Sequence, residues 1–384
     1  MTVMYPTIIF LIAIALSGCG SVPKCQTVTP IIQSDNKVIF ELANELRREH
    51  LAGTFDGVVV VAEGDTVLLK SAYGCANKED SITNTAAAIF DMGSIAKTFT
   101  AAAVLQLAHN DKLKLSDTIA DYYPTAPDAL KPITIQQLLG HNSGLDNFHN
   151  DSDFELMDKT QAEGRILTMP LIAKPGEKIA YSNAGFTLLA AIVEKVSKQP
   201  FQVYIHDNLL IPLNLSHTGF YQDSRISVRS LTRGYGGDDQ GSTTFEKGLT
   251  WALIGAGGMV TSIDDLVAWS KALKKGAIFA AEASNLVFTE ANDRWLLGSF
   301  ARTLIDDDSI IQMGGSTDYG YTALIQFVPN RDLLIVLLLN SHGSKYGNAA
   351  HHRLSRNHIL PILLGQVQQL QNNSMQTTAN AFAD

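Results

Sequence analysis

The sequence predicts an α/β fold of the α+β type, in which one mostly antiparallel sheet is formed from both chain ends and flanked by helices. Strand-like apolar runs occur early, in "GVVVVAEGDTVLLKSAYG", and late, in "YTALIQFVPNRDLLIVLLLNSHG". Between about residues 111 and 250 the pattern changes to helices and long loops. Because strands at the two ends enclose a helical middle, we expect a helical subdomain inserted into a single sheet.

The composition is that of a globular protein and narrows the choice of partners. The chain has 384 residues, of which 46% are hydrophobic and 17% charged, which is enough to bury a large core. Its net charge of −9, with no block rich in lysine or arginine, argues against a nucleic-acid partner. The glycine patterns of dinucleotide and phosphate loops do not occur, and we expect no cofactor.

The first residues have the pattern of an export signal. The apolar run over residues 8–16 is too short to span a bilayer but suits the central part of a signal peptide. The following "LSGC" resembles the bacterial lipobox, which makes Cys19 the candidate lipidation site after removal of residues 1–18. A lipoprotein anchored to a membrane in the bacterial periplasm is then expected, with residues 19–36 as a tether. No lysine or arginine precedes the run, and a plain secretory signal or a short anchor helix is the alternative.

Local patterns place the main elements of one folded domain, expected over residues 37–370. Apolar residues at helical spacing predict a helix over Lys37–Leu51, and two apolar runs around a Glu-Gly-Asp turn predict a β-hairpin. Helices are also predicted over Asn183–Ser197 and, with a cap at each end, over Ser262–Gly276. The continuous apolar run Leu333–Leu339 predicts a buried central strand.

The last part of the chain is predicted to close the domain and then to lose order. "HILPILLGQVQQL" predicts a helix that Pro361 interrupts. Residues 371–384 are rich in asparagine, glutamine and threonine, and we expect them to be disordered.

The stretch "FDMGSIAKTFTAAAVLQLA" places Ser94 and Lys97 one helical turn apart, at the start of an almost wholly apolar helix. A serine hydroxyl needs a neighbouring base to act as a nucleophile, and the free N–H groups of a helix start favour a developing oxyanion. Lys97 lies on the same face, where burial could make it a proton acceptor. Two more S-x-x-K matches, at Ser21 and Ser34, have no apolar helix after them. The simpler alternative is a capping serine beside a lysine that reaches the surface.

A tyrosine and an asparagine in "PGEKIAYSNAGFTLL" form a second candidate pair. Tyr181 can hold a shared proton, and Asn183 can both donate and accept hydrogen bonds. An interfacial tyrosine and an N-cap asparagine would fit the same pattern, and Y-x-N occurs again at Tyr346-Gly347-Asn348. This motif is therefore weak evidence alone.

In their order and separation, these motifs resemble the serine β-lactamase and penicillin-binding-protein superfamily. The series is S-x-x-K, "LLGHNSGL", Y-x-N, "GAGGMVTSIDDLVAW" and a glycine-rich turn before two long strands. It is similar to the branch of class C β-lactamases, D,D-carboxypeptidases and esterases. The resemblance implies that Ser94 is the acylated nucleophile and Lys97 its proton partner. It also implies that Tyr181 is the general base, which then protonates the leaving group, and that Asn183 holds Lys97 and the substrate amide.

The third motif of this superfamily departs from its usual form. Met313, in "IIQMGGSTDYGY", stands where a lysine or histidine is expected, followed by Gly314 and Gly315. The N–H of Ser316 can still form an oxyanion hole with that of Ser94. A thioether carries no charge and donates no hydrogen bond, so we expect recognition of a substrate carboxylate at this position to be weak.

Other residues have lower weight as site candidates. By the resemblance His141 is structural, and His351, His352 and His358 are expected on a polar helix face, with no metal site. Asp306–Asp308 is predicted to be a hairpin turn without the ligand spacing of a calcium loop. Export would permit a disulfide between Cys25 and Cys75, but two cysteines are too few to infer one.

The sequence therefore predicts an exported serine hydrolase that works through an acyl-enzyme on a small-molecule or peptide substrate. With Met313 in place of the cation, an esterase, amidase or D-amino-acid peptidase is favoured over an efficient β-lactamase. The rival hypothesis is a catalytically silent penicillin-binding-like protein that binds envelope peptides or a protein partner.

Overall fold

The computed structural model describes residues 25, 31–32, 36–149, 152, 154–237, 241–279, 285–342 and 346–365. The strands are β1 (Ile31–Ile32), β2 (Phe55–Glu63), β3 (Thr66–Tyr73), β4 (Cys75–Asn77), β5 (Ile82–Thr83), β6 (Ile89–Asp91), β7 (Gly219–Phe220), β8 (Met259–Ser262), β9 (Ala301–Ile305), β10 (Asp308–Ser316), β11 (Thr322–Val328) and β12 (Leu333–His342). The α-helices are α1 (Lys37–Leu51), α2 (Ala96–His109), α3 (Ile119–Tyr122), α4 (Ile135–Leu139), α5 (Lys159–Thr168), α6 (Asn183–Ser197), α7 (Phe201–Ile205), α8 (Thr244–Lys247), α9 (Ile263–Lys275), α10 (Ala350–Leu354) and α11 (Leu360–Leu363). Short 3-10 or π turns are η1 (Gly93–Ile95), η2 (His206–Leu210), η3 (Val228–Ser230), η5 (Leu286–Phe288), η6 (Pro329–Arg331), η7 (Gly347–Ala349) and η8 (Ser355–Ile359).

Strands from both ends of the chain form one antiparallel sheet, as the sequence predicted. Within the described residues its order is β1-β3-β2-β12-β11-β10-β9, so the last long strand pairs with the first one. β12 is central and lies between β2 and β11, in agreement with its continuous apolar run. The β2–β3 hairpin is confirmed.

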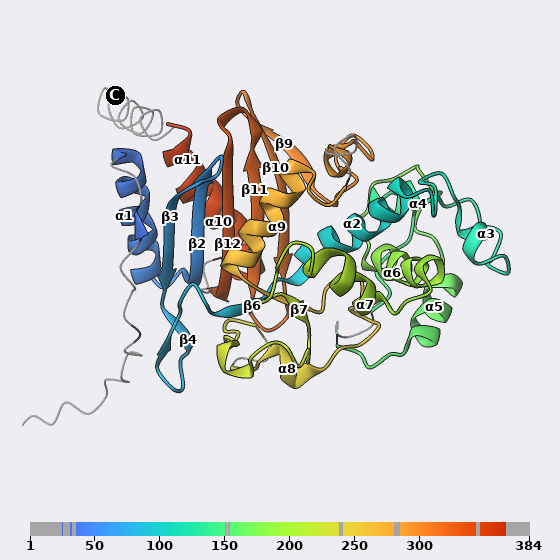
Figure 1. Ribbon diagram of the computed structural model, residues 1–384, viewed down its shortest axis with the longest axis horizontal. Coiled ribbons are helices and arrows are strands. Elements are labelled where there is room, and N and C mark those ends of the chain that lie inside the picture. The colour runs from blue at the N-terminus through green and yellow to red at the C-terminus, as the bar shows by residue number, and fades with distance from the viewer. Residues whose placement is uncertain are drawn as a thin grey trace, which may run out of the picture.

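Helices cover both faces of this sheet (Figure 1). One face packs its alternate side chains, such as Val59 and Val61, against α1 and the C-terminal helices α10 and α11. The opposite face, which includes Val58 and Val60, packs in a larger core with α2 and α9. The side-chain alternation of a strand thus gives each face its own apolar cluster.

The helical region lies beside the sheet and carries α3 to α8 (Figure 1). A small sheet of order β6-β8-β7 connects the two parts. β6 leads directly into η1 and α2, so Ser94 lies where the chain passes from the sheet into the helices.

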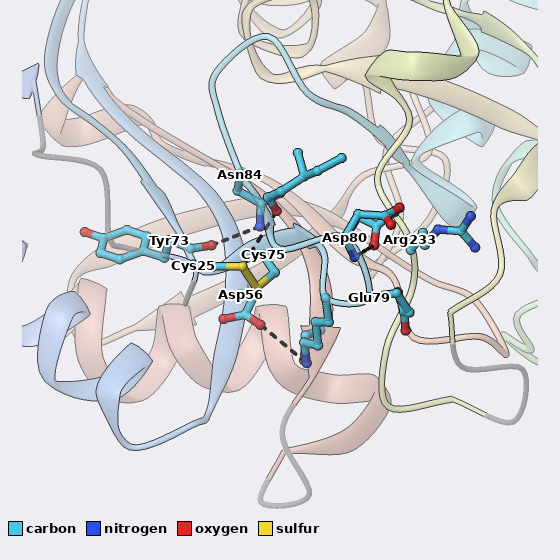
Figure 2. The surroundings of a disulfide bond; sticks show 12 residues. Cys25, Asp56, Tyr73, Cys75, Glu79, Asp80, Asn84 and Arg233 are labelled. Carbon is cyan, nitrogen blue, oxygen red and sulfur yellow. Dashed lines mark hydrogen bonds and ion pairs between the residues drawn. A yellow bond between two sulfur atoms is a disulfide. The ribbon is translucent and has the colours of Figure 1, made fainter. Parts of the chain in front are cut away.

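A disulfide joins Cys25 to Cys75 at the base of the sheet, with the two Cα atoms 5.2 Å apart (Figure 2). The sequence left this pairing open, and the structure supplies it. The bond ties the N-terminal segment to β4, next to the buried side chain of Asn84.

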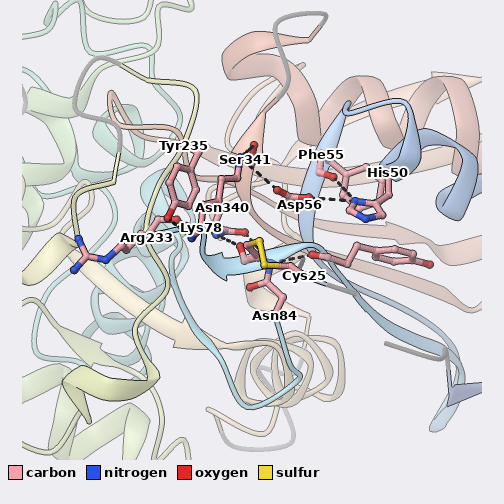
Figure 3. Close-up of polar contacts among 12 residues, drawn as sticks. Cys25, His50, Phe55, Asp56, Lys78, Asn84, Arg233, Tyr235, Asn340 and Ser341 are labelled. Carbon is pink, nitrogen blue, oxygen red and sulfur yellow. Dashed lines mark hydrogen bonds and ion pairs between the residues drawn. A yellow bond between two sulfur atoms is a disulfide. The ribbon is translucent and has the colours of Figure 1, made fainter. Parts of the chain in front are cut away.

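Buried asparagines hold this corner together (Figure 3). Asn340 of β12 donates through Nδ2 to Cys75 O at 2.9 Å and to Arg233 O at 2.8 Å. Its Oδ1 accepts a hydrogen bond from Asn84 Nδ2 at 3.0 Å. Nearby, Asp56 accepts a hydrogen bond from His50, which raises the pKa of His50. The hydrogen bond from Asn340 to Arg233 connects the end of the helical insert to the sheet.

The predicted helix limits agree with the structure in detail. α1 and α6 have the predicted bounds, and α9 has Ser262 as its N-cap and Gly276 as its C-cap. The C-terminal helix differs, since it consists of α10, η8 and α11, with Pro361 in the first turn of α11. The predicted signal peptide, Cys19 and the tail 371–384 lie outside the described residues. Among the described residues, none of the helices reaches the length and apolarity that crossing a bilayer requires.

Candidate active site

A cavity of about 470 Å³ opens at the C-terminal end of β10, beside the end of its pairing with β9. The pairing with β9 covers Asp308–Gln312, and the last residues of β10 line the cavity. Distant parts of the chain supply the wall, which consists of Ser94, Ile179, Tyr181, Arg294, Trp295, Ala301, Thr303, Gln312, Met313, Gly314, Gly315, Ser316, Asn348, Ala349, His351 and His352.

Ser94 lies in η1, two residues before the start of the α-helix in which the sequence placed it. Lys97, in the first turn of α2, is 0% exposed, so it does not reach the surface. Its ammonium donates hydrogen bonds to Ser94 Oγ at 3.1 Å and to the carbonyl oxygen of Ala256 at 2.8 Å. An amine buried beside a hydroxyl in this way is placed to exchange a proton with it.

Tyr181 forms the wall beside this pair and is 38% exposed. The centroid of its ring lies 4.9 Å from Lys97 Nζ. Tyr181 comes just before Ser182, the N-cap of α6, whose Oγ accepts a hydrogen bond from Gly185 N at 3.1 Å. The capped helix therefore fixes the backbone that carries Tyr181.

His141 packs against the ring of Tyr181 and does not line the cavity. The two rings stack with their centroids 4.5 Å apart, and His141 Nδ1 accepts a hydrogen bond from Ser182 N at 3.2 Å. Burial lowers the pKa of His141 well below its ordinary value, and the charges of Lys97 and Arg294 lower it further. A neutral His141 thus holds the tyrosine loop in place, in agreement with a structural role.

Asn183 is the first residue of α6 and lies on the other side of Ser94. It lines a small hollow of about 20 Å³ together with Ser94 and Ser316. Its Oδ1 is buried and accepts no hydrogen bond from the described residues, although its N–H donates to Asn147 Oδ1 at 2.9 Å. A buried oxygen without a donor is costly, so this atom suits the N–H of a bound group.

The end of β10 packs so closely against η1 that there is no room for a side chain at the contact, and each of the two segments has a glycine there. A Cβ on Gly93, whose φ is +51°, would lie 2.8 Å from Ser316 N. A Cβ on Gly315 would lie 2.9 Å from Ser94 N. The backbone N–H groups of Ser94 and Ser316 therefore belong to one junction, which is where an oxyanion hole needs them.

A buried carboxylate supports the turn before Ser94. Asp91 Oδ1 accepts a hydrogen bond from Gly93 N at 2.7 Å, and its Oδ2 accepts one from Tyr319 Oη at 2.5 Å and another from Tyr221. Burial, together with the charge of Asp91, raises the pKa of both tyrosines well above the ordinary value. They therefore stay protonated and serve as donors to Asp91.

The charged groups at the cavity wall come from outside the third motif. Met313 is 3% exposed and packs in the core as well as lining the cavity. Arg302, in the neighbouring strand β9, pairs with Glu290 at 2.6 Å and does not line the cavity. Arg294, His351 and His352 line the cavity, and none of the described residues in its lining carries a carboxylate.

The histidines of the C-terminal helices do not lie on one polar face. His351 and His352 are at the cavity, where a Cβ on Gly314 would lie 2.4 Å from His351 Nε2.

His358 points to α1, where its Nδ1 lies 2.7 Å from Glu45 Oε1 and its Nε2 lies 2.8 Å from Tyr346 Oη. Glu45, Glu49 and His358 each place a nitrogen or oxygen atom that could bind a metal within 4.8 Å of the others, a grouping that the sequence did not predict. Tyr346 therefore belongs to a contact between helices, away from Ser94.

The structure thus brings Ser94, Lys97, Tyr181 and Asn183 together with the glycine-rich end of β10. Sequence reasoning missed Arg294, Asp91 and the two cavity histidines. Asp91 could have been noticed, since it is an acidic residue in the apolar "IFDMGS" just before Ser94. Arg294 and the histidines carry no local pattern, because they reach the cavity only through the tertiary fold.

Comparison with known proteins shows the family to which the chain belongs. The family model for beta-lactamase matches residues 44–357. Protein flp of Staphylococcus aureus strain MRSA252 is 28% identical over 332 residues, and the match covers 81% of this chain but 64% of that protein. A teichoic acid D-alanine hydrolase of Staphylococcus aureus is 24% identical over 302 residues, covering 77% of this chain and 73% of that protein.

A solved structure has the same fold. The crystal structure of FmtA from Staphylococcus aureus superposes with a TM-score of 0.72 at 22% identity, covering 90% of this chain and 91% of that chain. The family match includes all of the cavity wall described above, from Ser94 to His352. The chain belongs to the beta-lactamase family.

Proposed function

We propose that the protein is a serine hydrolase that forms an acyl-enzyme at Ser94 and cleaves an ester or amide bond. The observation that carries the proposal is the 3.1 Å hydrogen bond between the buried Lys97 ammonium and Ser94 Oγ, at the wall of an open cavity. A lysine that only capped or solubilised the helix would not be buried against a serine.

The reaction follows from the positions of these groups. Ser94 Oγ attacks the substrate carbonyl carbon, and its proton passes to the pair formed by Lys97 and Tyr181, one of which is deprotonated before the attack, as a neutral amine or a phenolate. The carbonyl oxygen becomes negative between the N–H groups of Ser94 and Ser316. The proton then goes to the leaving oxygen or nitrogen as its bond to carbon breaks. A water molecule then attacks the acyl carbon of the acyl-enzyme and gives a proton to the same pair. The bond between this carbon and Ser94 Oγ breaks, Ser94 Oγ takes up the proton, and the acid is released.

The substrate proposed is an ester or amide of a small acyl group, with a D-alanyl ester as the first choice. One similar protein is named for hydrolysis of D-alanine on teichoic acid. Met313 leaves the cavity without a cation at the position expected to hold a carboxylate next to the reacting carbonyl. We therefore expect uncharged short-chain esters to be hydrolysed better than β-lactams.

A hydrolysis screen tests this proposal. Purified protein would be assayed with p-nitrophenyl acetate, a D-alanyl ester, a D-Ala-D-Ala peptide and nitrocefin, each with wild type and Ser94→Ala. The expected result is turnover of the esters that Ser94→Ala abolishes, with nitrocefin the poorer substrate. No turnover of any substrate by folded protein would favour the silent binding protein instead.

We also propose that the mature protein is exported and held at a membrane by lipid on Cys19, on the basis of the "LSGC" sequence. Cys19→Ala should release the protein from the membrane fraction or block its processing, as mass spectrometry and fractionation would reveal. A mature N-terminus elsewhere, without lipid, would refute the anchor.

A further inference from the structure

A second hollow of about 370 Å³ adjoins the active-site cavity. Thr303, Gln312 and His352 line both spaces, so a molecule bound near Ser94 can extend past them without leaving the protein surface. The second hollow lies between the β9–β10 hairpin and the C-terminal helices, where Arg356 forms part of its wall.

Arg356 is the source of positive charge in this hollow. Its side chain is exposed, and within the described part of the chain it makes no ion pair or hydrogen bond. Burial lowers the pKa of His352 and so favours its neutral ring. Among the described residues that line the hollow, the permanent positive charge is therefore that of Arg356. In the part of the chain that the structure describes, neither the hollow nor the cavity has a carboxylate in its lining, although the protein carries a net charge of −9.

Neutral hydrogen-bond donors accompany this charge. Gln312 Oε1 accepts a hydrogen bond from Gln326 Nε2 at 2.7 Å, and Gln326 Oε1 accepts one from Ser355 Oγ at 2.6 Å. This chain of contacts fixes the Gln312 amide and leaves its Nε2 as a donor at the place where the two spaces join. A guanidinium with an amide donor beside it is a common means of binding phosphate or carboxylate.

We propose that this hollow binds an anionic group, a phosphate or a carboxylate, that the substrate carries beyond the bond that is cleaved. The inference rests on the proposed function and specifies its substrate as an ester whose alcohol portion is negatively charged. It differs from carboxylate recognition at Met313, which would concern a group next to the reacting carbonyl.

Three D-alanyl esters test the proposal: those of glycerol, of glycerol 1-phosphate and of glyceric acid. Wild type should have a kcat/KM about tenfold higher for the better charged ester than for the glycerol ester. Added salt should reduce that ratio. A preference for the phosphate or for the carboxylate ester identifies which anion the substrate carries. Equal kcat/KM values for all three would overturn the proposal, while the proposed hydrolase function would stand.

A matched pair of variants assigns the effect to Arg356. Arg356→Gln should lower the charged-to-neutral ratio about tenfold, whereas Arg353→Gln, an exposed arginine one turn away and outside the lining, should not. An equal ratio in Arg356→Gln and wild type would contradict the assignment. If wild type cleaves none of the esters, the binding of glycerol 1-phosphate is measured by calorimetry. Binding that Arg356→Gln weakens would support the anion site and contradict the proposed hydrolase function. No binding to wild type would contradict the anion site.

Discussion

At the scale of single residues, Tyr181 is the side chain whose chemistry is easiest to isolate. Tyr181→Phe removes a hydroxyl from a residue that is 38% exposed, so the free energy of unfolding should change little. Acylation should slow by about 10²- to 10⁴-fold, as is typical when a general base is lost. Pre-steady-state release of p-nitrophenol measures this step.

Tyr346 offers the control, since it is the tyrosine of the other Y-x-N. Its hydroxyl contacts His358 and Glu49, so Tyr346→Phe should cost about 1 kcal/mol of stability but leave the acylation rate near that of wild type. If Tyr346→Phe slowed acylation more than Tyr181→Phe, the assignment of the tyrosine would be wrong.

His141 should make stability depend on pH. Its pKa is lowered in the folded state from the ordinary value of 6.5, because burial disfavours the charged ring. Below pH 6.5 the unfolded chain binds a proton that the folded protein does not, so stability is complete above this pH and falls as the pH drops. The contribution is at most about 1.4 kcal/mol per pH unit.

Urea unfolding of wild type and His141→Asn at pH 7 and pH 5 measures this pH-dependent contribution to the free energy of unfolding. Asparagine keeps an acceptor for Ser182 N but has no titrating ring. The variant should be less stable at pH 7 and should lose less stability on acidification. An equal loss in the two proteins would show that His141 is protonated in the folded state.

At the scale of elements, the disulfide is the main covalent link between the N-terminal segment and the sheet. It closes a loop with a sequence separation of 50, which in the chain-entropy model corresponds to about 4 kcal/mol. Cys25→Ser should therefore lower the unfolding temperature markedly, and reduced wild type should unfold like the variant. Neither cysteine lines the active-site cavity, so kcat at 25 °C should remain. An unfolding temperature that neither change affects would contradict this account.

Elements with caps and clear periodicity were predictable from the sequence. The ends of α9 follow from Ser262 as N-cap and Gly276 as C-cap, which act over a few residues. The N-cap of α6 is Ser182, and the alternative interpretation of Asn183 as the N-cap was wrong. The 3-10 turn at Ser94 was not predicted, because it depends on the contact of Gly93 with the far strand β10. The break in the C-terminal helix was placed at Pro361, but the π turn η8 begins earlier, at Ser355.

At the scale of the whole molecule, the cavity combines residues that the sequence separates widely. Ser94 and Tyr181 were found because each lies in a short motif with its neighbours. Arg294, His351 and His352 were not found as wall residues, because their positions depend on how β10 packs against the C-terminal helices. Motifs thus predicted the residues that we propose to react, whereas the residues around them in the cavity could be identified only from the tertiary structure.

The central claim is that Ser94 is a nucleophile activated by its surroundings, and covalent labelling tests it most directly. Folded protein would be treated with a fluorophosphonate, its intact mass measured, and the modified peptide sequenced, with Ser94→Ala treated in parallel. The account predicts a single adduct, located on Ser94 and absent from the variant. Folded wild type without an adduct, or an adduct on another serine that persists in Ser94→Ala, would contradict it.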